Sequence, residues 1–298
     1  MACDSTPARP LGTGVHTVIR LVPIAALAAV LLGVSRLPEP FRRSLVFEYG
    51  NPTVLTAYTA PFVHFSSSHL TANVAVLLVA GGTLAHLSGR GRSPWLFVGV
   101  FVALVSTLPI VVTLLNLAVP RPGVTYGFSG VNMALVGALP VAVVEYVDSQ
   151  LDGRTDARLL VAWFTASTGY VAAVVVPLSS GSAIVIALSA GVVLVVSVQL
   201  LVGGIDASSF FGRLPSDRSA LLGVGAWGIL VAVGFPRATV VDGTVPNAYV
   251  HFVGYAIGFI TTYLAYELLF SRLPTDSARM KKAATTETSS IEATRRRK

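Results

Sequence analysis

The sequence predicts an all-α polytopic membrane protein with about eight transmembrane helices. Of the 298 residues, 53% are hydrophobic and 12% are charged, whereas a soluble domain carries about 25% charge. The mean hydropathy is +0.73, and apolar runs of about 20 residues recur between charges, Gly and Pro. A single cysteine, Cys3, lies outside these runs. We therefore expect neither a disulfide framework nor a thiolate metal site.

Each apolar run predicts one span, and the first reads as a retained helix because it lacks a small-residue cleavage site. The fifth and sixth are separated only by "PLSSGS", which indicates a tight turn, and the seventh is short. Residues 37–63 are mixed in character and are expected to lie partly in the membrane interface. The spans are 18–36, 67–88, 94–119, 128–147, 158–178, 182–203, 219–235 and 249–271.

Three regions follow from this pattern: a cytoplasmic N-terminal segment over 1–17, a transmembrane domain over 18–271, and a disordered basic tail over 272–298. Lys and Arg are more frequent on the side that holds both termini, which predicts that both termini are cytoplasmic. The expected location is the cell membrane. The net charge of +7 comes largely from "RMKK" and "RRRK". Such runs usually flank a lipid surface, so no nucleic-acid partner is expected.

Polar side chains at membrane depth are costly and therefore mark candidate functional positions. His64, His69 and Asn73 open the second span, Ser129 opens the fourth, and His251 opens the last. These spans are all even-numbered, so they run in the same direction. The polar residues are therefore expected at a similar depth near the outer face.

Small residues accompany Ser129 and His251 at helical spacing. Gly254 and Gly258 follow His251 on one face of the last span, and Gly130, Ala134 and Gly137 form a stripe on the fourth. Small-residue stripes let helices approach closely in lipid. We expect the two helices to pack together and to bring the His251 imidazole near the Ser129 hydroxyl.

This arrangement is chemically suited to nucleophilic catalysis. A serine needs an adjacent base, and His251 can take its proton and return it to a leaving amine. No carboxylate lies at this depth, which favours a Ser–His dyad. His69 and Asn73 share a helix face and can donate to an oxyanion, and Ser66, Ser67 and Ser68 are expected to line a water route. A serine in "GFSG" alone is more often a packing residue, but the combined pattern favours catalysis.

The stretches "HFSSSHLTAN", "GFSG" and "HFVGYAIG" together resemble the rhomboid family of intramembrane serine proteases. The resemblance implies a rhomboid-like helical bundle and a serine endopeptidase that cleaves single-span membrane proteins without a cofactor or metal. It assigns Ser129 as nucleophile, His251 as general base, and His69, Asn73 and the Ser129 backbone N–H as the oxyanion hole. The supporting residues are His64, Gly127, Gly130, Gly254 and Gly258.

The sequence departs from the family pattern at three places. Three predicted spans lie between Ser129 and His251 where the family has one, so we expect a hairpin inserted within 150–217 into a six-helix core. The first outer loop carries "FRR" at 41–43 instead of a Trp-Arg pair. Met133 stands where an aromatic residue is common.

Two other functions fit the composition: a non-catalytic rhomboid-like protein that binds membrane helices for quality control, and a transporter. The presence of both Ser129 and His251 disfavours the first, and the lack of clear repeats or mid-membrane charges disfavours the second. The sequence has neither a His-Glu-x2-His zinc motif nor a pair of membrane aspartates. It assigns no role to His86, Glu145 or Asn132, and it does not specify the oligomeric state.

Overall fold

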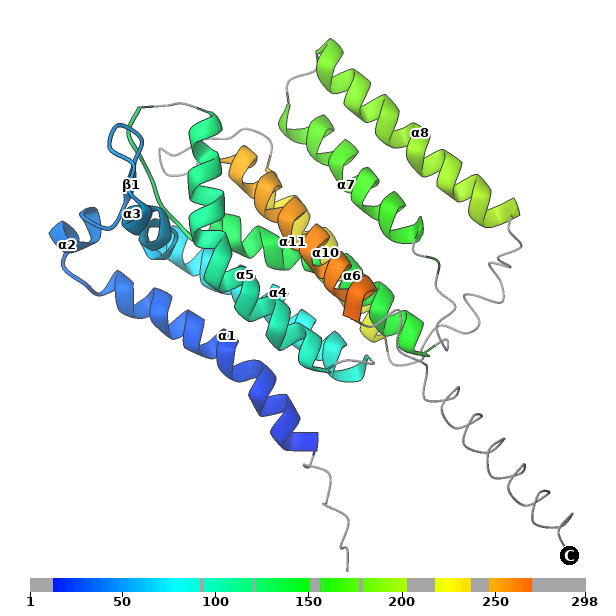
Figure 1. Cartoon of the computed structure of the whole chain (residues 1–298), viewed down its shortest axis with the longest axis horizontal. Helices are drawn as coiled ribbons and strands as arrows, with labels where there is room; N and C mark the ends of the chain where they lie inside the picture. The colour runs from blue at the N-terminus through cyan, green and yellow to red at the C-terminus, as the bar shows by residue number, and fades with distance from the viewer. Residues whose placement is uncertain are drawn as a thin grey trace, which may run out of the picture.

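The computed structural model describes residues 13–91, 94–119, 122–150, 156, 158–176, 179–202, 218–236 and 247–269. The predicted tail over 272–298 and most of the predicted N-terminal segment lie outside these residues. The described chain is almost entirely helical (Figure 1). Its elements are α1 (Thr13–Ser35), α2 (Glu39–Arg43), β1 (Phe47–Glu48), α3 (Val54–Thr59), η1 (Ala60–Phe62), α4 (Ser67–Arg90), α5 (Pro94–Leu115), η2 (Asn116–Ala118), β2 (Val124–Thr125), α6 (Ser129–Gln150), α7 (Arg158–Val175), α8 (Ser180–Val202), α10 (Ser219–Gly234) and α11 (Ala248–Leu269).

The long helices coincide with the predicted spans, which confirms the expected polytopic all-α class. Within the described residues, seven helices are long and apolar enough to cross a membrane: α1, α4, α5, α6, α7, α8 and α11. The remaining predicted span is α10, whose 16 residues give a length of about 24 Å. A bilayer core is about 30 Å thick, so α10 alone falls short of a full crossing.

Helix α6 forms the centre of the bundle, and its whole apolar window is buried. It packs against α4, α5, α10 and α11, while α1 covers the outer face of α4 (Figure 1). The helix that begins at Ser129 is thus the most enclosed part of the protein. These six helices form the predicted core.

Helices α7 and α8 pack mainly against each other and form a hairpin at the edge of the bundle (Figure 1). Only 11% of the α8 window is buried, which leaves most of that helix facing outward. The position agrees with the expected insertion between Ser129 and His251. Helix α7 connects the hairpin to the core through a hydrogen bond from Tyr255 Oη to Ser167 Oγ (2.9 Å).

The mixed segment 37–63 folds into short elements at one end of the bundle. Thr53 caps α3 by accepting the N–H of Thr56 on its hydroxyl. Strand β1 pairs antiparallel with β2, with Phe47 opposite Thr125. This pairing connects the segment between α1 and α4 to the loop that leads directly into Ser129.

Candidate functional site

The packing of α6 against α11 determines the geometry of the site. A Cβ at Gly254 would lie 2.0 Å from the carbonyl oxygen of Gly130, and one at Gly258 would lie 2.0 Å from that of Ala134. Real atoms cannot approach so closely, so only glycine permits this contact. The two pairs have the same sequence offset, so the helices run parallel and in register. The predicted contact between the small-residue stripes is therefore present, and it places Ser129 and His251 at the same end of the bundle.

The loop before α6 is held in a conformation that requires glycine. Gly127 has φ +104°, in the left-handed region that residues with side chains rarely adopt. Its N–H donates to the carbonyl of Ala60 (3.1 Å). A Cβ on Gly127 would also lie 2.6 Å from Cε1 of His69. The imidazole of His69 thus packs directly against the "GFSG" loop.

Helix α4 carries the two predicted oxyanion donors. It begins with a cap in which Ser66 Oγ accepts the N–H of His69 (3.1 Å). One turn further on, Asn73 is buried and its Nδ2 donates to the His69 carbonyl (3.0 Å). An amide nitrogen carries two hydrogens, so one remains for another acceptor.

The His251 ring is fixed by α10 rather than by Ser129. Its Nδ1 lies 2.6 Å from the carbonyl oxygen of Gly234. Because a carbonyl only accepts, Nδ1 carries the proton and Nε2 is the basic nitrogen of the neutral ring. Among the described residues, no hydrogen bond joins Ser129 Oγ to His251, so the expected dyad contact is absent from this conformation. Such contacts often form only when substrate is bound.

An aromatic side chain packs beside His251 even though Met133 replaces the family aromatic. Phe235 follows α10 directly and meets the His251 ring edge to face, with centroids 6.2 Å apart. Met133 instead packs toward Gly234, where a Cβ would lie 2.5 Å from its sulfur. The end of α10 thus supplies both a hydrogen-bond acceptor and an aromatic neighbour to His251.

His64 supports the backbone of the loop before Ser129. It is 2% exposed, and its Nε2 accepts the N–H of Phe128 (3.4 Å). The pKa of His64 is lowered to about 4, chiefly by burial and also by the neighbouring His69 ring, while a hydrogen bond to the backbone of Phe62 partly opposes the shift. The neutral ring is therefore the form that accepts from Phe128 at physiological pH.

Arg42, from the "FRR" stretch, anchors the segment that contains His64. Its guanidinium donates from Nη1 to the His64 carbonyl and from Nε to the Leu37 carbonyl (3.1 Å). It also lies over the ring of Phe65, 5.1 Å from the centroid. One arginine thus ties α2 to the start of α4 without a tryptophan partner.

A cavity of about 40 Å³ adjoins Ser129 between the ends of α5, α6 and α11. Its polar lining includes Thr113, Asn116, Thr125 and Asn247. Asn247 Nδ2 donates to Asn116 Oδ1 (2.8 Å) and so connects η2, which follows α5, to the start of α11. Ser66, Ser67 and Ser68 are not among the residues that line this cavity, so the expected water route past them stays a prediction. Ser66 caps α4.

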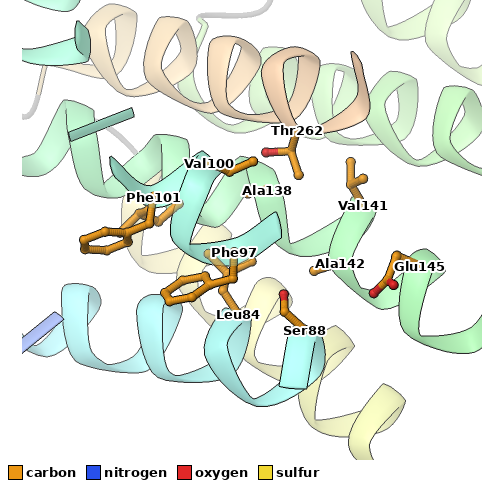
Figure 2. A pocket seen from close by; sticks show the side chains of 11 residues that line it. Leu84, Ser88, Phe97, Val100, Phe101, Ala138, Val141, Ala142, Glu145 and Thr262 are labelled. Carbon is orange, nitrogen blue, oxygen red and sulfur yellow. The ribbon is translucent and has the colours of Figure 1, made fainter. Parts of the chain in front are cut away.

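A second cavity lies away from Ser129 and His251, toward the opposite end of α6. It measures about 20 Å³ and is lined by residues of α4, α5, α6 and α11, including Glu145, Ser88 and Thr262 (Figure 2). Ligand pockets usually measure about 300–1,000 Å³, so this space is a packing void. The described residues include no group of three or more His, Cys, Asp or Glu arranged to hold a metal ion.

The structure adds residues to which the sequence had assigned no role. Gly234 and Phe235 contact His251, and Asn132 donates to Asn73. The contact of Gly234 and Phe235 with His251 could have been predicted from the order of the spans, because the predicted seventh span ends on the side of the membrane where the span of His251 begins. No spacing pattern links Asn132 to Asn73, because their contact is between α6 and α4.

Comparison with known families identifies the chain. The Rhomboid domain model matches residues 51–199, half of the sequence, from α3 through most of α8. The match includes His64, His69, Asn73 and Ser129, and it ends before His251. No curated protein and no solved structure matches. With this domain match and its helical bundle, the chain belongs to the rhomboid family of multi-pass membrane proteins.

Proposed function

We propose that this protein is an intramembrane serine endopeptidase that hydrolyses peptide bonds in or near the transmembrane segments of single-span membrane proteins. The observation that carries the proposal is the in-register parallel packing of α6 and α11. It brings a serine and a histidine, from helices far apart in sequence, to one end of the bundle beside two further polar side chains. Membership of the rhomboid family also supports the proposal.

The first chemical step follows from the tautomer of His251. Nε2 accepts the Ser129 hydroxyl proton as Oγ attacks the substrate carbonyl carbon. The Gly234 carbonyl, held by Nδ1–H, stabilises the ring as it becomes positively charged. The carbonyl thus takes the orienting position that a carboxylate has in a triad.

The negative charge on the tetrahedral oxygen is stabilised by donors of the site. These are the remaining Nδ2 hydrogen of Asn73, the His69 ring and the Ser129 N–H. Such donors act strongly where water is excluded, and Asn73 is 4% exposed. The intermediate then collapses, the C–N bond breaks, and His251 gives its proton to the leaving amine.

Hydrolysis of the acyl-enzyme needs water at Ser129. The adjoining cavity of about 40 Å³ has a polar lining, and a water molecule needs roughly 10–15 Å³. The cavity therefore has room for water beside the ester. His251 Nε2 removes a proton from this water as its oxygen bonds to the acyl carbon. The bond from that carbon to Ser129 Oγ then breaks, and Nε2 returns the proton to Oγ, which regenerates the hydroxyl.

The proposed location is the cell membrane, with both termini cytoplasmic and Ser129 near the outer face. Cysteine labelling tests this orientation in a Cys3→Ser background. An impermeant reagent should label Val54→Cys on α3 in intact cells and Gln150→Cys, at the end of α6, only after lysis. The opposite pattern would invert the proposed topology.

A second candidate function is membrane-helix binding without catalysis. The missing hydrogen bond between Ser129 and His251 favours it, because an inactive member does not need that contact. A fluorophosphonate probe separates the two functions, since it reacts with activated serines. The protease proposal predicts labelling of the purified protein that is lost in Ser129→Ala and in His251→Ala. A helix-binding protein would not be labelled, and would capture a substrate helix equally well with Ser129→Ala.

A further inference from the structure

Asn132 lies one helical turn after Ser129 and contacts the predicted oxyanion donor Asn73. It is 1% exposed. Its Nδ2 donates to the side-chain Oδ1 of Asn73 (3.0 Å) and to the backbone carbonyl of Asn73 (2.9 Å). This pair of hydrogen bonds joins α6 to α4 directly below the site.

The contact determines which way the Asn73 amide faces. A half-turn of that amide exchanges its oxygen and nitrogen, which otherwise fit the same space. With a donor fixed at Asn132, the favoured orientation has Oδ1 toward α6 and Nδ2 toward the His69 carbonyl. The second Nδ2 hydrogen is then available to an oxyanion. The reversed amide would present an acceptor, which repels that charge.

Asn132 is poorly explained by stability alone. Among the described residues, no donor reaches its buried Oδ1. Leaving a buried acceptor unpaired is unfavourable, and an apolar residue at the same position would avoid this. Residues that do not favour stability are typical of functional sites.

We propose that Asn132 is a positioning residue that orients the Asn73 amide for oxyanion stabilisation. The proposal rests on the proposed protease function, because it acts through Asn73. It assigns no contact between Asn132 and the substrate. The effect of Asn132 on the reaction therefore depends on Asn73 being present.

The test compares Asn132→Leu and Asn132→Asp in the wild-type and Asn73→Ala backgrounds. Leu removes the donor at similar volume, and Asp replaces it with an acceptor that favours the reversed Asn73 amide. Cleavage of a transmembrane substrate in proteoliposomes gives kcat and KM, and thermal unfolding gives stability. Val143→Ala serves as the control, since Val143 is buried on α6 and packs toward Gly223 of α10.

Both variants should lower kcat by about 10- to 100-fold with KM unchanged, a smaller loss than complete removal of a donor, and Asp should be at least as severe as Leu. Asn132→Leu should unfold at the same temperature as the wild type or higher. In the Asn73→Ala background neither variant should lower kcat further. The control should lose stability while kcat stays near the wild-type value.

Three results would overturn the positioning role: an unchanged kcat in both variants, an equal loss of kcat in the Asn73→Ala background, or failure of both variants to fold. The last would make Asn132 a structural residue. Failure of the protease proposal looks different, because the wild type and Ser129→Ala would then give the same cleavage.

Discussion

Gly254 of α11 lies against the carbonyl oxygen of Gly130 in α6, with space for a hydrogen but not for a methyl group. Because the opposing atom belongs to the backbone, a side chain at 254 cannot be accommodated by a rotamer change. The helices would have to separate. The distance between the starts of α6 and α11 therefore depends on Gly254 and Gly258, which take no chemical part in the reaction.

Gly258→Leu and Gly254→Ala should each lower cleavage activity by more than tenfold, because separating the helices moves His251 away from Ser129. Overpacking should also destabilise the protein by about 1–3 kcal/mol. Gly99→Ala is the matched control, since nothing lies within 4 Å of a Cβ there. Activity equal to wild type in both glycine variants would show that the helix contact does not set the site.

Asn73→Ala and His69→Ala should reduce kcat more than they raise KM, because an oxyanion exists only in the transition state. Each lost donor should raise the barrier by about 2.7–4 kcal/mol. Steady-state kinetics in proteoliposomes measures both constants. An increase in KM alone would identify these side chains as substrate contacts.

Acid should destabilise the fold through His64. Its folded pKa, about 4, lies below the unfolded value of 6.5, so the unfolded state binds a proton first as pH falls. The stability from the neutral ring is complete above about pH 6.5 and declines toward pH 4, by about 3 kcal/mol. Unfolding of detergent-solubilised protein across this range measures it. His64→Gln, which cannot titrate, should flatten the slope, and an unchanged slope would assign it to other groups.

Tyr255→Phe should loosen the α7–α8 hairpin. The Tyr255 hydroxyl accepts from Trp227 Nε1 (3.2 Å) and donates to Ser167 Oγ (2.9 Å), which connects α10, α11 and α7. Hydrogen bonds in membrane proteins contribute about 0.6 kcal/mol each, so the loss should be about 1 kcal/mol. Thermal unfolding measures it against Tyr170→Phe, on the exposed face of α7. Equal stability of the two variants would place the attachment of the hairpin elsewhere.

The sequence predicted the spans because lipid requires long, continuous apolar helices. It predicted the depth of Ser129 and His251 because alternate spans run in the same direction. The long helices coincide with the predicted spans, and the packing of Gly254 and Gly258 toward α6 confirms that α6 and α11 begin at the same end of the bundle. The depth of this end in the membrane stays a prediction. These features depend on length, order and local spacing, all of which are readable along one chain.

The remaining features depend on contacts between distant segments. The pairing of Phe47 with Thr125 involves two strands of two residues each, too short for a periodic signal. The acceptor for His251 is a backbone carbonyl at Gly234, and any residue type supplies a carbonyl. Asn132 contacts Asn73 only because α4 and α6 adjoin. The spacing of residues within one segment does not predict contacts between segments that are far apart in the sequence.

The most direct test of the proposed protease activity is cleavage of a single-span membrane substrate by the purified protein in proteoliposomes, compared with Ser129→Ala. We predict two fragments from the wild type, with the new ends inside or beside the substrate's transmembrane segment. We predict no cleavage by Ser129→Ala, although that variant inserts and folds normally. Cleavage by Ser129→Ala at the wild-type rate would contradict the assignment of Ser129 as the nucleophile.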